Sequence, residues 1–119
     1  MINIRKQIYS MLSDTGVEVK MTQPSGDIVL PVIVYAEITN VNVSMRQDRL
    51  EYQVDVYHDR FDDCLLLAQH VDYIMTRAGW HRTYKTPDTN AKVKTGLYKI
   101  ALSYTARVDT LKNEILTAF

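Results

Sequence analysis

The chain has 119 residues, of which 46% are hydrophobic and 24% are charged, the composition of one ordinary globular domain. Lys+Arg and Asp+Glu are both 14, so the sequence does not have the basic excess typical of a protein that neutralises many phosphates. One cysteine excludes an internal disulfide and favours a reducing compartment. We therefore expect one domain over residues 1–119, with no sequence-specific nucleic-acid partner.

No run of residues approaches the ~20 apolar positions of a membrane-spanning helix. The opening MINIRKQIYS has neither the long apolar stretch nor the small-residue cleavage site of a secretory signal. We therefore expect no membrane partner.

The start of the chain predicts a helix between Asn3, whose side chain can cap it, and Gly16, which lies where it would end. Its apolar residues recur at i, i+4, i+7 and i+8, namely Ile4, Ile8, Met11 and Leu12. Residues 17–30 then predict two short extended runs around the turn sequence PSGD. Pro31 indicates a sheet edge or an irregular start, and residues 32–45 predict one or two strands.

The middle of the chain predicts a strand that leads directly into a long helix. Every second residue of LEYQVDVY is apolar and shares one face: Leu50, Tyr52, Val54 and Val56. The period then becomes helical for five turns, at Phe61, Cys64, Leu65, Ala68, Val71, Ile74, Met75 and Ala78. Gly79 follows this run as the expected residue after the helix.

The last third predicts a strand over residues 80–85, a long polar hairpin loop over 86–96 and the longest strand over 97–108. DTLKNEILTAF then predicts a short helix capped by Asp109 or Thr110. The whole order is α-β-β-β-α-β-β(-α). It predicts a single α+β domain with a largely antiparallel sheet packed by one long amphipathic helix.

The segment VDVYHDRFDDCLLLAQHV concentrates residue types that bind metals and transfer protons. A metal centre formed around His58 and Asp59 would need further ligands from other elements, and only His70 and His81 remain. His70 falls roughly 120° around the helix from Cys64, so spacing alone does not close a coordination sphere. The pattern therefore disfavours a metal or catalytic site, although it leaves a small metal-dependent hydrolase as an alternative.

The same acidic residues suit the start of a helix. Asp59 lies where an N-cap belongs, and Asp62 lies three residues further on, where an acidic side chain can bond back to the cap. Asp62 and Asp63 both meet the positive end of the helix dipole, each contributing about 0.3–1 kcal/mol. Cys64 belongs to the apolar stripe, which predicts a buried and unreactive thiol. We therefore favour a capped helix here.

Other catalytic patterns are absent, among them the nucleotide-binding glycine loops, H-E-x-x-H, C-x-x-C and G-x-S-x-G. We therefore expect no enzyme, no catalytic residue, no metal and no cofactor. Tyr52, Tyr98 and Tyr104 fit the core-facing register of their strands, whereas Tyr57 faces the other way and is expected to be available to a partner.

Charge is segregated along the chain. Residues 48–63 hold six acidic and two basic residues, and residues 80–112 hold seven basic and two acidic ones. Such segregation is typical of a solvated surface, or of two complementary faces on copies that join head to tail.

The order of the predicted strands, helix and loop resembles that of the phage tail terminator proteins, also called tail completion or minor tail proteins. The resemblance rests on the strands PVIVYAEI and YQVDVYHD, the helix RFDDCLLLAQHVDYIM, a tryptophan strand, a long polar loop and the final strand LYKIALSYTARVD. It covers roughly residues 30–110.

The resemblance implies a structural virion protein, made and assembled in the host cytoplasm and located at the head–tail joint. Its copies would form a hexameric ring at the head-proximal end of the tail tube, which ends tail growth and provides the surface for head docking. Its partners would be other copies of itself, the major tail tube protein and the head–tail connector proteins. The close alternative is a head-completion or connector protein of the phage neck, and a ferredoxin-like binding module unrelated to phage is a more distant one.

A ring requires one patch to meet a different patch on the neighbour. The candidates for this subunit interface are drawn from the acidic and the basic region, namely Asp59, Asp62, Asp63, Lys85, Lys92, Lys94 and Lys99. The lysines at 85, 92 and 94 belong to the predicted long loop or border it, and they are candidates to face the ring lumen or the tube.

Overall fold

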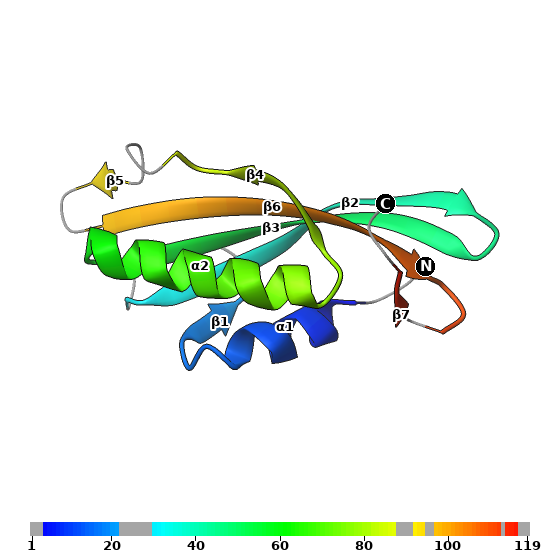
Figure 1. The fold of residues 1–119 in the computed structure, drawn as a ribbon, viewed down its shortest axis with the longest axis horizontal. Coiled ribbons are helices and arrows are strands. Elements are labelled where there is room, and N and C mark those ends of the chain that lie inside the picture. Colours follow the sequence, from blue (N-terminus) through cyan, green and yellow to red (C-terminus); the bar gives the residue numbers. More distant parts are fainter. Residues whose placement is uncertain (1–3, 22–29, 88–91, 95–96, 113, 117–119) are drawn as a thin grey trace.

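The computed structural model describes residues 4–21, 30–87, 92–94, 97–112 and 114–116. Within these ranges two helices and seven strands follow one another as α1 (Arg5–Ser13), β1 (Glu18–Lys20), β2 (Val32–Ser44), β3 (Gln47–His58), α2 (Phe61–Arg77), β4 (His81–Lys85), β5 (Lys92–Lys94), β6 (Leu97–Asp109) and β7 (Glu114–Ile115). The strands form one sheet, with both helices on the same side of it (Figure 1).

The sheet has the strand order β1-β2-β3-β6-β4, and β5 and β7 also pair with β6. Every pairing is antiparallel except that of β1 with β2, which is parallel. The predicted fold class, α+β with a largely antiparallel sheet and one long amphipathic helix, is therefore confirmed.

Three long strands give the molecule its elongated shape. β2, β3 and β6 have 13, 12 and 13 residues, and at about 3.3 Å per residue such strands reach roughly 40 Å. The molecule measures 48 × 26 × 22 Å. The β2–β3 hairpin forms one end of the long axis, and the start of α2 lies at the other end (Figure 1).

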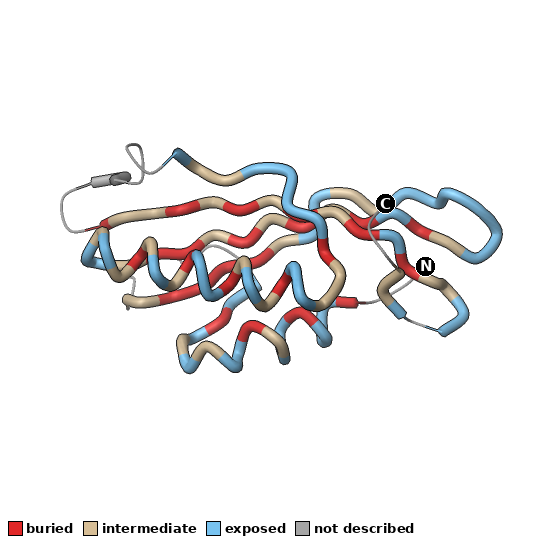
Figure 2. The backbone as a smooth tube through the Cα atoms, in the orientation of Figure 1, coloured by how far each residue is buried: buried red, intermediate tan, exposed pale blue. Residues whose placement is uncertain are grey.

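The main core lies between the helices and the sheet, as the buried positions in Figure 2 show. The predicted inward face of β3 is fully buried: Leu50, Tyr52, Val54 and Val56. α2 covers it with the stripe that helical spacing predicted, whose buried members are Cys64, Ala68, Val71 and Met75. Full burial of one Val or Met side chain contributes about 1.5–3 kcal/mol, so this stripe holds α2 on the sheet.

A smaller cluster lies on the opposite face of the sheet and contains Val32, Val34, Tyr57 and Leu97. The expectation that Tyr57 is available to a partner was wrong, because its side chain is only 2% exposed. Tyr52 and Tyr104 are buried in the main core as predicted, and Tyr98 packs against Phe61 with 5.7 Å between ring centroids.

A polar contact ties α2 to the far strands of the sheet. The Tyr104 hydroxyl donates to Asp72 Oδ1 at 2.8 Å, and Arg82 Nη1 lies 3.0 Å from Asp72 Oδ2. Burial, followed by the hydrogen bond to Asp72, raises the pKa of Tyr104 well above its usual value. Asp72 therefore fixes the position of α2 along β6 and β4.

Both ends of the predicted first helix can be compared with α1. Its N-cap position is Ile4, with no side-chain cap, and the predicted cap Asn3 lies outside the described residues. Gly16 has φ +77°, which agrees with the predicted helix end.

The predicted C-terminal helix was wrong within the described residues. The Asp109 carboxylate does accept the backbone N–H groups of Leu111 and Lys112, as a helix cap would. The chain nevertheless reverses direction, and β7 pairs with the end of β6. This pairing satisfies backbone groups that a helix would have satisfied internally.

The predicted hairpin loop over residues 86–96 was also wrong in part, because it contains the short strand β5, which pairs with the start of β6. Backbone hydrogen bonding with β6 starts before β5, where the Thr86 N–H donates to the Ala101 carbonyl at 2.9 Å. The other loop residues, 88–91 and 95–96, lie outside the described ranges.

Gly79 ends α2 with φ +103°, and a Cβ added there would lie 3.1 Å from Ile115 Cγ2 on β7. Gly16 also has a positive φ, but an added Cβ there has no neighbour within 4 Å.

We predict that Gly79→Ala lowers the free energy of unfolding by about 2 kcal/mol or more, because backbone strain adds to crowding. Gly16→Ala is the matched control. It should lower the free energy of unfolding by about 1 kcal/mol, because it adds backbone strain without crowding. Urea unfolding measures both, and equal losses would show that the approach of β7 to Gly79 does not matter.

Candidate functional site

The acidic segment before α2 does not form the predicted cap. The N-cap position belongs to Arg60, whose side chain makes no cap hydrogen bond, so the prediction for Asp59 was wrong. Asp59 Oδ1 instead lies 2.9 Å from Nδ1 of the neighbouring His58, and the Arg60 N–H points to the same ring nitrogen at 3.3 Å. The Asp59 carboxylate is therefore directed at the His58 ring and not at the backbone N–H groups that begin α2.

Asp62 and Asp63 lie in the first turn of α2, as predicted. Asp63 forms an ion pair with Arg60, at 3.8 Å between Oδ2 and Nε, and both partners are well exposed. Such a pair contributes little to stability because water screens it. Asp62 is exposed at the same end of the molecule and presents its carboxylate to solvent.

Cys64 is fully buried in the main core, and its thiol donates to the Val56 carbonyl at 3.5 Å. Burial raises the pKa of Cys64 to about 11. The predicted burial of Cys64 is therefore confirmed, and a protonated, inaccessible thiol is a poor nucleophile.

Within the described residues, no three His, Cys, Asp or Glu side chains lie close enough together to hold a metal ion. His58 and Asp59 form only a pair. His70 is exposed on α2, nine residues past the first residue of the helix.

The lysines named as interface candidates lie on β4, β5 and β6. Lys99 Nζ is 3.7 Å from Asp55 Oδ2 and 5.8 Å from the centre of the Tyr57 ring. Lys85 is half-buried at the end of β4, and Lys92 and Lys94 belong to β5.

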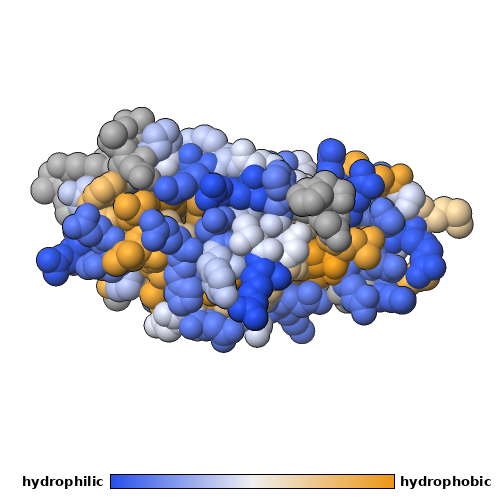
Figure 3. Space-filling view, viewed as in Figure 1, coloured by the Kyte–Doolittle hydropathy of each residue, from blue (hydrophilic) through white to orange (hydrophobic). Residues whose placement is uncertain are grey.

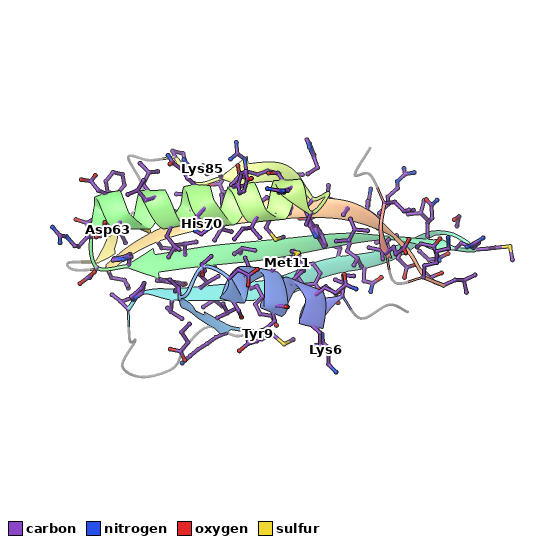
Figure 4. All side chains as sticks on the ribbon, turned by 60° about the horizontal axis from the view of Figure 1, so that its bottom comes forward. Lys6, Tyr9, Met11, Asp63, His70 and Lys85 are labelled. Atoms are coloured by element: carbon purple, nitrogen blue, oxygen red, sulfur yellow. The ribbon has the colours of Figure 1, made fainter. Side chains whose placement is uncertain are left out.

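The two charged regions are therefore neighbours within one chain. β3 and β6 pair along their whole length, so the acidic segment and part of the basic one lie side by side. β5 and the start of α2, with Asp63, also share one end of the molecule (Figures 1 and 4). The interface role of Asp59, Asp62, Asp63, Lys85, Lys92, Lys94 and Lys99 stays a prediction.

Sequence reasoning missed the concentration of exposed apolar side chains on the β2–β3 hairpin. Met45 at its turn is 97% exposed, and Ile38, Val41 and Val43 on β2 are 44–50% exposed. Figure 3 shows hydrophobic surface at this end and again over the start of α2. The period-two alternation of VNVSM was the available signal, but it does not reveal that this part of the strand extends past both helices.

An open hollow of about 370 Å³ lies between α1 and β2 and is lined by Arg5, Lys6, Tyr9, Met21 and Tyr35. Figure 4 places Lys6 and Tyr9 on the outer side of α1. Burial raises the pKa of Tyr35, and the nearby Arg5 opposes this shift. The described residues that line the hollow combine two aromatic rings with two cationic groups and a methionine.

Neither helix in the described part of the chain has the length and apolar character needed to cross a bilayer.

No protein-family model matches this chain, and a search of curated proteins finds no relative. Comparison with solved structures does find a match, to a chain of the structure called "Virion of native gene transfer agent (GTA) particle". That chain superimposes with a TM-score of 0.66 and 14% sequence identity, over 86% of this chain and 91% of its own length. At this identity the likeness establishes a shared fold.

The burial of Cys64 leads to a prediction about its reactivity. At pH 8, a pKa of about 11 leaves roughly a hundredfold less thiolate than an ordinary cysteine has, and burial restricts access further. We expect a thiol-disulfide reagent to label the folded chain at least 100-fold more slowly than the chain in denaturant. Because the folded state binds this proton more tightly, its contribution to stability is complete below the ordinary thiol pKa and is lost as the pH rises through about 11. Rapid, complete labelling of the folded chain would contradict this picture.

Proposed function

We propose that this chain is a structural protein of a phage-like virion and not an enzyme. The observation that carries the proposal is the shared fold with a chain of a gene transfer agent virion, over 86% of one chain and 91% of the other. Nearly equal coverage means that the two chains have similar size as well as similar topology. A fold alone does not decide function, which depends on the residues of a site. An enzyme with this fold would therefore need a catalytic site in addition to it.

The chemistry of the described residues supports a structural role. The single cysteine packs in the core, and its thiol is protonated at neutral pH. The His58 ring lies against the Asp59 carboxylate, with 2.9 Å between Nδ1 and Oδ1. Cys64 is thus used for packing, and His58 for local structure.

More specifically, we propose a tail terminator, which forms a hexameric ring at the head-proximal end of the tail tube, ends tube growth and provides the surface for head docking. Its partners would be further copies of itself, the major tail tube protein and the head–tail connector proteins. The support is the resemblance of the strand and helix textures to that family, together with an elongated shape that leaves apolar side chains exposed on the hairpin. A neck connector of the same virion is the rival, because its requirements for self-association and docking are the same.

The two roles predict different docking partners. We expect the purified chain, added during polymerisation of the major tail tube protein of the same virion, to shorten the tubes in proportion to its concentration. Electron microscopy should then show added density at one tube end. An unrelated protein of the same size at equal concentration is the control. Unchanged tube lengths, combined with binding to portal particles, would reject the terminator role and support the connector.

The predicted interface can be tested separately at α2. We expect Asp62→Lys with Asp63→Lys to weaken self-association about tenfold or more, because two exposed acidic groups become basic. Asp14→Lys with Glu18→Lys is the matched control, since it reverses two exposed charges near the end of α1 and should leave association unchanged. Native mass spectrometry over a concentration series measures both. Unaltered assembly of the α2 variant would remove the acidic residues from the interface.

A further inference from the structure

The open face of the β2–β3 hairpin presents an apolar and cationic surface. Val41 pairs with Arg49 across β2 and β3, and Arg49 pairs with Arg107 across β3 and β6. These three side chains are exposed and form one row on the sheet face that the helices leave uncovered. With Val43 and Met45 beside it, this row defines the hairpin surface.

The row brings like charges together. Arg49 and Arg107 occupy directly opposite positions on neighbouring antiparallel strands, an arrangement that destabilises a sheet unless an anion neutralises it. Glu51 lies two residues along β3 and Asp109 lies two residues along β6 on the same face. Asp109 is already paired with Arg46, so Glu51 is the acidic neighbour left to the two arginines on these strands. The surface therefore favours a partner that carries both a carboxylate and an apolar contact.

The hairpin is ordered in advance of any contact. The Asn42 side-chain amide donates to the Ser44 carbonyl at 2.7 Å and to Asp48 Oδ1 at 3.0 Å. Asp48 is only 4% exposed, so this bond satisfies a buried carboxylate. Arg46 adds an ion pair with Asp109 at 3.4 Å, and its carbonyl accepts the Thr110 N–H. A surface that is ordered beforehand loses less conformational entropy on binding.

The chain carries the complementary chemistry at its other end. Asp62, Leu66 and Tyr73 recur at i, i+4 and i+11 on α2, so they share the outer face of the helix. Leu66 is 62% exposed and Tyr73 is 57% exposed. Asp62 supplies a carboxylate at one end of this helix surface, and Arg77 stacks on Tyr73 at the other, 5.7 Å from the ring centre.

We propose that the hairpin surface of one copy packs on the helix surface of the next copy, head to tail. Arg49 and Arg107 then face Asp62, and the apolar residues of the hairpin cover Leu66. The hairpin surface and the start of the helix surface lie at opposite ends of the long axis, and the helix surface continues along α2 toward the middle (Figure 1). The contact is therefore heterologous and generates a ring when its rotation closes. This inference rests on the proposed ring and identifies the surfaces that form it.

Substitutions at two exposed positions test the contact. Val43→Glu alters the hairpin surface, and Leu66→Glu alters the helix surface. Because both side chains are about half exposed or more, the variants should fold. Tyr9→Glu, at an exposed position of α1, is the matched control. We expect each of the first two variants to raise the concentration needed for association about tenfold or more, and the control to match the unaltered chain.

Mixing the two defective variants gives the decisive result. In a head-to-tail contact, the Leu66→Glu chain still offers a hairpin and the Val43→Glu chain still offers a helix surface, so the mixture forms heterodimers that cannot extend. Native mass spectrometry, with the two chains distinguished by isotope labelling, should therefore show a mixed dimer and no larger species. Failure of the mixture to associate, or an unaltered chain that stays monomeric throughout the series, would overturn the contact. The tube-length measurement is independent of this result, so a failure here is distinguishable from a failure of the terminator role.

Discussion

The central pairing of β3 with β6 is the constraint on which the rest of the structure depends. It runs without a register shift from Gln47 opposite Asp109 to His58 opposite Tyr98. Because side chains alternate along each strand, this unbroken register places most apolar residues of both strands on the face that the helices cover, whereas Tyr57 and Leu97 lie on the other face. A slip of one residue would turn the buried tyrosines, Tyr52 and Tyr104, out of the core.

The apolar face of the sheet then determines where the helices pack. α1 and α2 cover the apolar face, and the Asp72 contact with Tyr104 and Arg82 fixes α2 along it. The sheet is longer than the helices, so the hairpin continues beyond them and its side chains remain in solvent (Figure 2). The exposed ends of this elongated molecule carry the surfaces that we propose for recognition.

The acidic segment before α2 illustrates how far local sequence signals reach. Spacing correctly predicted the strand, the helix, the buried Cys64 and Gly79 as the residue after the helix. It failed at Asp59, because a cap signal treats each side chain as independent, whereas the Asp59 carboxylate lies against the neighbouring His58 ring. The C-terminal helix failed for a related reason, since pairing of β7 with β6 outweighed local helix propensity.

The sequence by itself determined the α+β class, the inward face of β3, the buried stripe of α2 and the lack of a recognisable catalytic motif. These features depend on periodicity and residue type, which act over a few neighbouring positions. Only the tertiary structure decided that the acidic and basic segments lie side by side, that Tyr57 is covered, and that Arg49 meets Arg107 on the open face. These features join residues distant in the chain, and their positions follow from strand pairing, which local patterns do not encode.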